Sequence, residues 1–405
     1  MACETGVDET SIGLRWHAST APRLANDFVI VVRADAKSSM KRILLLAIGV
    51  FGTVAGVADP APAPLTPFLL EVPLTSTALM GRVDSALAAK IVTIVNKPQP
   101  SPTGDAHDYV SYARYWWPDP AKPGGLPFIR NDGHSNVDQV KLGDEPCLGR
   151  FTGTVESLAL GWAVLNRSDC ARRAGEWLRA WFVDPATRMK PALDYAQIRL
   201  GHENNLGSAS GVLDARSLTS ITDALRLLHG SPALTTDEEL AVRSWFGDYA
   251  HWLATGKSAV GEHAAANNHG SWYLVQTVAI CRYLGCDDEA RRLCEEDRAR
   301  IAQQIKPDGT QPAELARADG LGYSVFNLEA QFKLAHLAEG LGIDLWHYAS
   351  PDGASLKLAF AYLLPFNGGQ KKWPGTQYRK INPSFLNPLI PAATRAWPEL
   401  FGRGT

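Results

Sequence analysis

Hydrophobic residues recur at intervals of three and four through most of this chain, which is the spacing of one face of an α-helix. The first such stretch covers about 66–97, where Leu79, Val83 and Leu87 share a face. Alternation of apolar and polar residues, the mark of a half-buried strand, is scarce. Beyond residue 150 the helical spacing predicts eight further helices, at 154–165, 171–182, 217–228, 237–254, 272–284, 289–305, 325–341 and 354–364. The pattern therefore predicts one all-α domain.

The predicted helices come in pairs with short polar connections. Asn166-Arg167-Ser168 joins one pair and Gly230-Ser231-Pro232 joins another, while Thr236 and Glu239 have the spacing of a capping box. Repeated helical hairpins with apolar faces favour a toroid or solenoid of helix pairs over a compact bundle. Because the sequence has no repeat of fixed length, solenoids built on short motifs are disfavoured.

Two irregular regions interrupt the helical pattern. Residues 98–150 are rich in proline, glycine, aspartate and aromatic residues, and long loops in compact domains are often functional. The second region is Asn267-Asn268-His269, which precedes the apolar run at 272–284. In the simplest interpretation an asparagine there caps a helix. In the alternative interpretation the three polar residues use the helix N-terminus to hold an anion.

The N-terminal region has the pattern of a secretory signal peptide. Met40-Lys41-Arg42 precedes an apolar run at 43–51, and small residues follow up to Ala58. A membrane anchor is the alternative, but the apolar run is too short to span a bilayer comfortably. The expected organisation is a misassigned extension at 1–39, a signal peptide at 40–58, a Pro/Ala linker at 59–65 and the folded domain at 66–405. The protein is then secreted or periplasmic.

Composition narrows the possible partners. With 45% hydrophobic residues, 20% charged residues and a net charge of −2, the 405-residue chain lacks the basic excess of nucleic-acid-binding domains. Its 12 tryptophans and 11 tyrosines suit both a core and a surface that stacks on sugar rings. Export permits disulfides, and Cys281 and Cys286 are close enough in sequence to pair across a helix end. The absence of CxxC and HExxH motifs leaves no case for zinc.

Three segments rich in polar and aromatic residues carry a resemblance to a known family. The first, at 107–130, contains His-Asp-Tyr-x-Ser, Tyr-Trp-Trp-Pro-Asp-Pro and Gly-Leu-Pro-Phe-Ile-Arg. The second, at 267–273, reads Asn-Asn-His-Gly-x-Trp-Tyr, and the third, at 314–329, contains Glu-Leu-x-Arg and Tyr-Ser-x-Phe-Asn-Leu-Glu. In this order they resemble the alginate lyase superfamily of polysaccharide lyases, in particular the branch that includes bacterial glucuronan lyases. The resemblance implies an (α/α)6 or (α/α)7 toroid and metal-free β-elimination by Asn268, His269, Arg317 and Tyr323.

The implied reaction explains these residue types. β-Elimination from a 1,4-linked uronate removes the C5 proton and expels the C4 oxygen, and neutralising the carboxylate stabilises the enolate-like intermediate. Asn268, Arg317 and protonated His269 can supply that neutralisation. Tyr323 is the candidate base and acid, provided that neighbouring cations stabilise its phenolate, and His269 is the competing base.

The stereochemistry of the sugar limits what the motif can select. In mannuronate and glucuronate the departing proton and oxygen lie on one ring face, so one tyrosine can serve both in a syn elimination. These two sugars differ only at C2, so the catalytic residues do not choose between alginate and glucuronan. Guluronate is inverted at C5 and would need the base and the acid on opposite faces, so it ranks lower.

Other residues are candidates for binding the polymer. Aromatic, basic and amide side chains outside the predicted helices could contact sugar rings and carboxylates: His107, Trp116, Trp117, Tyr195, Gln197 and Arg216. Two alternative functions are a helical-toroid glycoside hydrolase, with Glu314 and Asp319 as its carboxyl pair, and a non-catalytic polysaccharide-binding protein. The prediction is a monomeric lyase that acts on an anionic polysaccharide, without nucleic acid, membrane, metal or cofactor.

Overall fold

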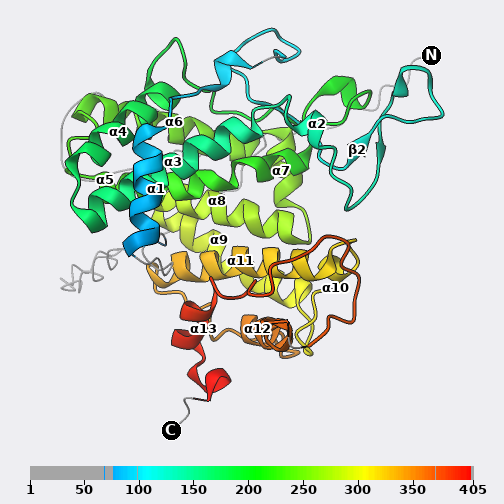
Figure 1. Cartoon of the computed structure of the whole chain (residues 1–405). Helices are drawn as coiled ribbons and strands as arrows, with labels where there is room; N and C mark the ends of the chain where they lie inside the picture. Colours follow the sequence, from blue (N-terminus) through cyan, green and yellow to red (C-terminus); the bar gives the residue numbers. More distant parts are fainter. Residues whose placement is uncertain (1–67, 69–75, 98, 370, 403–405) are drawn as a thin grey trace, which may run out of the picture. The chain divides into compact units, whose positions relative to one another are not determined.

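The helices pack against one another in an inner and an outer layer, and Figure 1 shows their arrangement. A computed structural model describes residue 68 and residues 76–97, 99–369 and 371–402. The described helices belong to one compact unit, Pro60–Thr405. Neighbouring helices of the inner layer lie in chain order, and each buries an apolar face in the core. They are α3 (Glu145–Leu165), α5 (Leu218–Leu228), α8 (Asn268–Leu284) and α11 (Gly320–Glu339).

A second set of helices covers the inner layer from outside. The helices α1 (Ser76–Ala88) and α4 (Ser168–Leu178) pack on α3, and α6 (Thr236–Thr255) and α9 (Asp287–Gln304) pack on α8. The helix α12 (Leu356–Leu363) packs on α11, and α13 (Ile390–Ala396) follows it in the chain. Inner and outer helices alternate along the sequence, which is the arrangement of an α/α toroid. The predicted all-α fold class is therefore confirmed.

Three inner helices begin earlier than the hydrophobic spacing predicts. Helix α3 begins at Glu145 rather than 154, α8 at Asn268 rather than 272, and α11 at Gly320 rather than 325. Polar residues and glycines occupy these first turns, so the apolar period is not visible there. Two of the polar motifs consequently lie on the first turns of inner helices and not in the loops before them.

The capping box of α6 is displaced by one residue from its predicted place. The side chain of Thr235 accepts a hydrogen bond from the backbone N–H of Glu238, and the Glu238 carboxylate accepts one from the backbone N–H of Thr235. The pair is thus Thr235 and Glu238, not Thr236 and Glu239.

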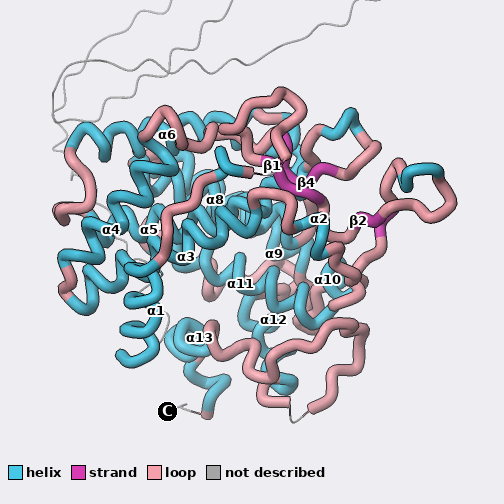
Figure 2. Tube along the Cα trace, turned by 45° about the horizontal axis from the view of Figure 1, so that its top comes forward, coloured by secondary structure: helices cyan, strands magenta, loops and turns pink. Residues whose placement is uncertain are grey.

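Short strands and helical turns occupy the irregular regions of the sequence. The strand β1 (Val110–Tyr112) pairs in parallel with β4 (Tyr195–Ile198), and β2 (Trp116–Trp117) pairs antiparallel with β3 (Ile129–Arg130). Figure 2 shows these strands together with α2 (Val137–Val140). The remaining turns are η2 (Ile94–Asn96), η3 (Pro123–Gly125), η4 (Arg179–Val183), η5 (Glu203–Asn205), η6 (Ala209–Ser217), α7 (Lys257–His263), α10 (Pro312–Leu315), η7 (Leu364–Phe366) and η8 (Pro398–Phe401).

Three of these turns lead directly into inner helices. The turn η6 precedes α5, α7 precedes α8, and α10 precedes α11. Helix α7 was not among the predicted helices. Because each turn packs against the start of an inner helix, it can position side chains at that end of the layer.

Several sequence predictions fall outside these elements. The extension at 1–39, the signal peptide at 40–58 and the linker at 59–65 lie outside the described residues. Within the part that is described, no helix is both long and apolar enough to cross a membrane. The cysteines in that part are free thiols, including Cys281 and Cys286, whose spacing allows a disulfide. Burial raises the pKa of Cys281 to about 12.

Candidate active site

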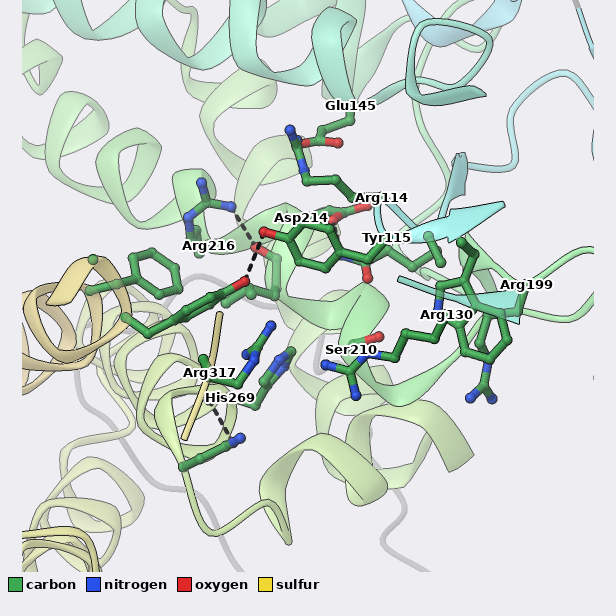
Figure 3. Close-up of a pocket in the computed structure, with 18 of the residues that line it drawn as sticks. Arg114, Tyr115, Arg130, Glu145, Arg199, Ser210, Asp214, Arg216, His269 and Arg317 are labelled. Carbon is green, nitrogen blue, oxygen red and sulfur yellow. Dashed lines mark hydrogen bonds and ion pairs between the residues drawn. The ribbon is translucent and has the colours of Figure 1, made fainter. Parts of the chain in front are cut away.

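The inner helices all begin at the wall of one cavity of about 700 Å³ (Figure 3). Glu145 is the first residue of α3, Arg216 lies just before α5, His269 is in the first turn of α8, and Tyr323 is in the first turn of α11. The N-terminus of an α-helix carries unpaired N–H groups and about half a positive charge. Because α5 continues directly from η6, three such ends, those of α3, α8 and α11, lie at the cavity, where they favour a negatively charged ligand.

Arginine side chains add to this positive potential. Six arginines line the cavity, namely Arg114, Arg130, Arg199, Arg216, Arg317 and Arg379. The carboxyl groups in the lining are those of Glu145 and Asp214. Guanidinium groups therefore outnumber carboxyl groups in the lining, although Asp132, Glu203 and Asp319 pair with four of these arginines from just outside it.

The start of α8 differs from the prediction in one respect. Asn267 caps the helix, its side chain accepting from the backbone N–H of His269 at 3.2 Å, and it also lines the cavity. Asn268 is fully buried, and its side-chain amide and backbone N–H donate to the two carboxylate oxygens of Glu314, each at 2.7 Å. The prediction placed Asn268 in the cleft and Asn267 in the cap. In the structure Asn267 both caps the helix and faces the cavity. The side chain of Asn268, the first residue of α8, points towards α10 and not into the cavity.

His269 lies in the cavity wall with its ring held from behind. Its Nδ1 atom is 2.6 Å from a carboxylate oxygen of Glu262, a residue of α7 whose side chain is 2% exposed. Burial raises the pKa of Glu262, and the contact with His269 opposes that shift. His269 therefore lies in the cleft as predicted, and the Glu262 carboxylate lies behind its ring.

Arg317 and Tyr323 face each other at the start of α11. The guanidinium carbon of Arg317 is 3.8 Å from the centroid of the Tyr323 ring, a cation–π contact. Nε and Nη2 of Arg317 donate to the two oxygens of Asp132, at 3.1 and 2.7 Å. These hydrogen bonds hold the pKa of Asp132 well below its usual range. Arg317 is thus a fixed cation directly above the Tyr323 ring.

The Tyr323 phenol donates a hydrogen bond of 2.8 Å to the phenol of Tyr115. Burial and this contact raise the pKa of Tyr323 well above its ordinary value, although Arg317 acts in the opposite direction. Arg317 lowers this pKa as expected of a neighbouring cation, but burial and the Tyr115 contact raise it by more. Tyr323 is accordingly a neutral phenol when the cavity holds no ligand.

The structure brings some of the predicted polymer-binding residues into the cavity. Trp116, Gln197 and Arg216 line it. The Arg199 guanidinium lies 5.4 Å from the Trp116 ring centroid, which makes a composite aromatic and cationic surface. Arg216 lies 5.4 Å from the ring of Phe326, another cavity residue.

Three other predicted polymer-binding residues lie elsewhere. Trp117 follows Trp116 on a strand and so points to the opposite side, where its Nε1–H donates to the carbonyl of His134. Tyr195 packs with Val110 and the rest of a small satellite cluster. His107 hydrogen-bonds the carbonyl of Arg188 and borders a different surface hollow of about 420 Å³.

Gln197 enters the cavity through an unusual backbone conformation. Its φ is 50°, in the left-handed region that side-chain-bearing residues seldom adopt, and the pairing register of β4 with β1 shifts at this point. Its Nε2 donates to Asp214 at 2.7 Å, and its backbone N–H donates to Ser111 at 2.7 Å. Burial raises the pKa of Asp214 to about 6. A buried hydrogen-bond network thus fixes the Gln197 amide.

Several cavity residues were not predicted from the sequence: Arg114, Tyr115, Arg130, Arg199, Asp214 and Arg379. Tyr115 and Arg130 lie within the first motif, so that motif could have indicated them. Arg379 follows the last motif by many residues, and its side chain is held by Asp319. Nothing local in the sequence marks it as part of the site.

Comparisons with known proteins agree with this geometry. The family model described as alginate lyase matches residues 93–373. The chain belongs to the alginate lyase family. A crystal structure of an alginate lyase from Bacteroides ovatus is 34% identical, covers 79% of this chain and 85% of that chain, and has a TM-score of 0.76.

A more distant structure shares the fold alone. It is a variant of alginate lyase A1-III complexed with a tetrasaccharide, 17% identical, with coverage of 85% of this chain and 92% of that chain and a TM-score of 0.51. A search of curated protein sequences gave no match. The family membership and the α/α toroid make this protein a polysaccharide lyase.

The carboxyl pair of the hydrolase alternative does not face the cavity. Glu314 is buried against Asn268, and Asp319 is buried in an ion pair with Arg379. A glycoside hydrolase needs two carboxyl groups on either side of the bond that breaks. The structure therefore contradicts the prediction that Glu314 and Asp319 form the carboxyl pair of a hydrolase.

Proposed function

We propose that this lyase cleaves a 1,4-linked polyuronate, either β-1,4-glucuronan or mannuronate-rich alginate, by syn β-elimination. The product carries a C4–C5 unsaturated uronate at its new non-reducing end. The observation that carries this proposal is the arginine-lined cavity in which Arg317, His269 and Tyr323 meet. The alginate lyase from Bacteroides ovatus supports the substrate class through its similarity.

The first requirement of the reaction is to neutralise the uronate carboxylate. Among the described contacts of Arg317, Nε and Nη2 are engaged by Asp132, so Nη1 is left for a substrate carboxylate. The side-chain NH2 group of Asn267, which also lines the cavity, provides a further donor. Fixed donors at the position where charge develops stabilise the enolate-like intermediate without reorganisation.

The second requirement is proton transfer at C5 and at O4. We assign proton donation to the leaving O4 to Tyr323, which is a neutral phenol in the free cavity. Two groups are placed to take the C5 proton, Tyr323 itself and His269. The contact of His269 Nδ1 with Glu262 favours His269, because it leaves Nε2 of the neutral ring to accept a proton.

The pH profile of kcat/KM distinguishes the two bases. A histidine base gives the profile an acidic limb, because protonation of the ring removes the base. A tyrosine base whose pKa is raised would instead give activity that increases into the strongly alkaline range. An acidic limb near neutrality supports His269, and a profile that still increases above about pH 10 supports Tyr323.

The substrate test is incubation with polymannuronate, glucuronan and polyguluronate, followed by ultraviolet absorbance of the new double bond. We expect absorbance with glucuronan or polymannuronate and little with polyguluronate. New reducing ends without absorbance would indicate hydrolysis, and no cleavage of any of the three polymers would overturn the proposal. Because such polymers are found outside cells, we also propose that the signal peptide at 40–58 directs export.

A further inference from the structure

Helix α7 carries a buried carboxylate directly behind the ring of His269. Glu262 is the sixth residue of Lys257–His263, and its side chain is 2% exposed. Burying an ionised carboxylate is costly unless a hydrogen-bond donor compensates for the lost water. In the described part of the chain, His269 Nδ1 is the partner of this carboxylate, at 2.6 Å. The position of Glu262 is therefore explained by His269.

The contact determines which ring nitrogen meets the ligand. An ionised carboxylate only accepts hydrogen bonds, so the Nδ1 atom of His269 must carry a proton. In the neutral imidazole the other nitrogen, Nε2, is then unprotonated. The ring lies in the cavity wall with its Nδ1 edge against α7, so Nε2 is the nitrogen left for a ligand.

The backbone at this point is fixed as well. The N–H of His269 donates to the side chain of Asn267, which caps α8. Gly270 follows, and a Cβ atom there would lie 2.1 Å from the carbonyl oxygen of Ala265, so the segment entering α8 packs closely against the first turn of the helix. Both the ring and the main chain of His269 are thus held in one orientation.

We propose that Glu262 is a positioning residue for His269: it keeps the proton on Nδ1 and presents an unprotonated Nε2 to the sugar. The consequence for catalysis rests on the proposed lyase function, whereas the orientation and tautomer of the ring do not. A carboxylate behind a histidine also favours the imidazolium that forms when Nε2 takes a proton. Glu262 would therefore support His269 as the base at C5.

Other charged and titratable groups surround the same ring. Glu314 on α10 is close enough that His269 affects its pKa, and Arg317 and Tyr323 line the cavity from the start of α11. Arg300 of α9 reaches the start of α8 by donating to the Ala265 carbonyl. Among these groups, the one that hydrogen-bonds the imidazole is Glu262.

The chain contains a matched control for this pair. His263 contacts Glu296 at 2.7 Å through Nε2, but this pair does not line the cavity. Glu262→Gln and Glu296→Gln each remove a charge behind one histidine while keeping the side-chain shape. The second substitution should leave turnover of the polymer unchanged.

The direct experiment is a long-range ¹H–¹⁵N correlation spectrum of the histidine-labelled full chain, without substrate. His269 is assigned by the loss of its signals in a His269→Gln variant. We expect the neutral ring to carry its proton on Nδ1 in the native protein. A proton on Nε2 would overturn the proposal whatever the enzymatic activity, so this measurement is independent of the substrate.

The kinetic experiment uses the polyuronate that the enzyme cleaves best. Glu262→Gln should lower kcat by about 10- to 100-fold with little change in KM, and should move the acidic limb of the profile to lower pH. Thermal unfolding of the variant checks that it folds. An unchanged kcat and an unchanged acidic limb would refute the role, whereas inactivity of the native enzyme on every polyuronate would refute the proposed function instead.

Discussion

The phenol of Tyr323 donates to the phenol of Tyr115 across 208 positions of sequence. This hydrogen bond connects the first turn of α11 with the segment that leads into β2. It also helps to keep Tyr323 protonated in the free cavity, together with burial. The proton that Tyr323 can give to a leaving oxygen is therefore stored in a contact between two distant parts of the chain.

Tyr323→Phe should remove this proton and abolish turnover, because proton transfer by a positioned side chain contributes about 10²- to 10⁴-fold. Binding of the polymer should remain, since the substitution keeps the aromatic ring and leaves the arginines of the cavity in place. Steady-state kinetics and calorimetric titration measure the two effects. Tyr348→Phe, outside the cavity lining, is the control and should behave as the native enzyme. Retention of more than a tenth of native kcat would remove Tyr323 from the acid role.

Tyr115→Phe should lower the pKa of Tyr323, because the Tyr115 contact is one of the causes that raise it. An acid is active only while it is protonated. The alkaline limb of kcat/KM should consequently move to lower pH in this variant, while the acidic limb stays in place. A shift of the acidic limb instead would mean that Tyr115 acts on the base.

Asp132→Asn should weaken substrate binding through Arg317. The Asp132 carboxylate holds two guanidinium nitrogens, and its pKa lies far below the usual range, so the native pair persists through mildly acidic pH. Loss of hydrogen bonds to a charged group costs about 1.5–3 kcal/mol, which corresponds to about a 10- to 100-fold increase in KM. Asp138→Asn, at a fully exposed side chain on α2, is the matched control. Equal KM values for the two variants would contradict this role of Asp132.

Asp297 should make the stability of the native protein depend on pH. It is fully buried between α9 and α11, where Gln331 donates to its Oδ1 at 3.2 Å, and burial raises its pKa from 3.8 to about 7. The folded state thus keeps a proton that the unfolded state loses, so stability falls as pH rises from about 4 to about 7.

Asp297→Asn should remove that part of the pH dependence, since an amide of the same shape cannot ionise. Chemical denaturation at several pH values between 4 and 8 compares the native protein, this variant and Asp248→Asn, whose side chain is exposed on α6. The native protein and Asp248→Asn should lose stability in parallel over this window. If the Asp297→Asn variant loses as much stability over this window as the native protein, Asp297 is not protonated in the folded state.

The sequence predicted the layout of helices well because buried helices carry a clear apolar period. All eight helices predicted beyond residue 150 are present. The starts of α3, α8 and α11 were missed, since their first turns hold polar residues and glycines that serve the cavity. Local hydrophobicity is thus least informative at the places where the function is concentrated.

Individual side chains at the site were harder to predict. The motifs indicated His269, Arg317 and Tyr323. They did not indicate that Asn267, and not Asn268, faces the cavity, because this depends on the direction in which α8 begins. The contacts of Arg317 with Asp132 and of Tyr323 with Tyr115 join residues 185 and 208 positions apart. Such pairs depend on how loops fold over the helix ends, which no local period encodes.

The convergence of three helix N-termini on one cavity limits how this scaffold can change. Part of its positive potential comes from backbone amides, which no amino-acid replacement removes. Mutational drift among the arginines can therefore alter which acidic sugar is accepted while the preference for acidic polymers persists. We therefore expect a few substitutions to change which acidic glycan the enzyme accepts, but not to make it accept neutral glycans.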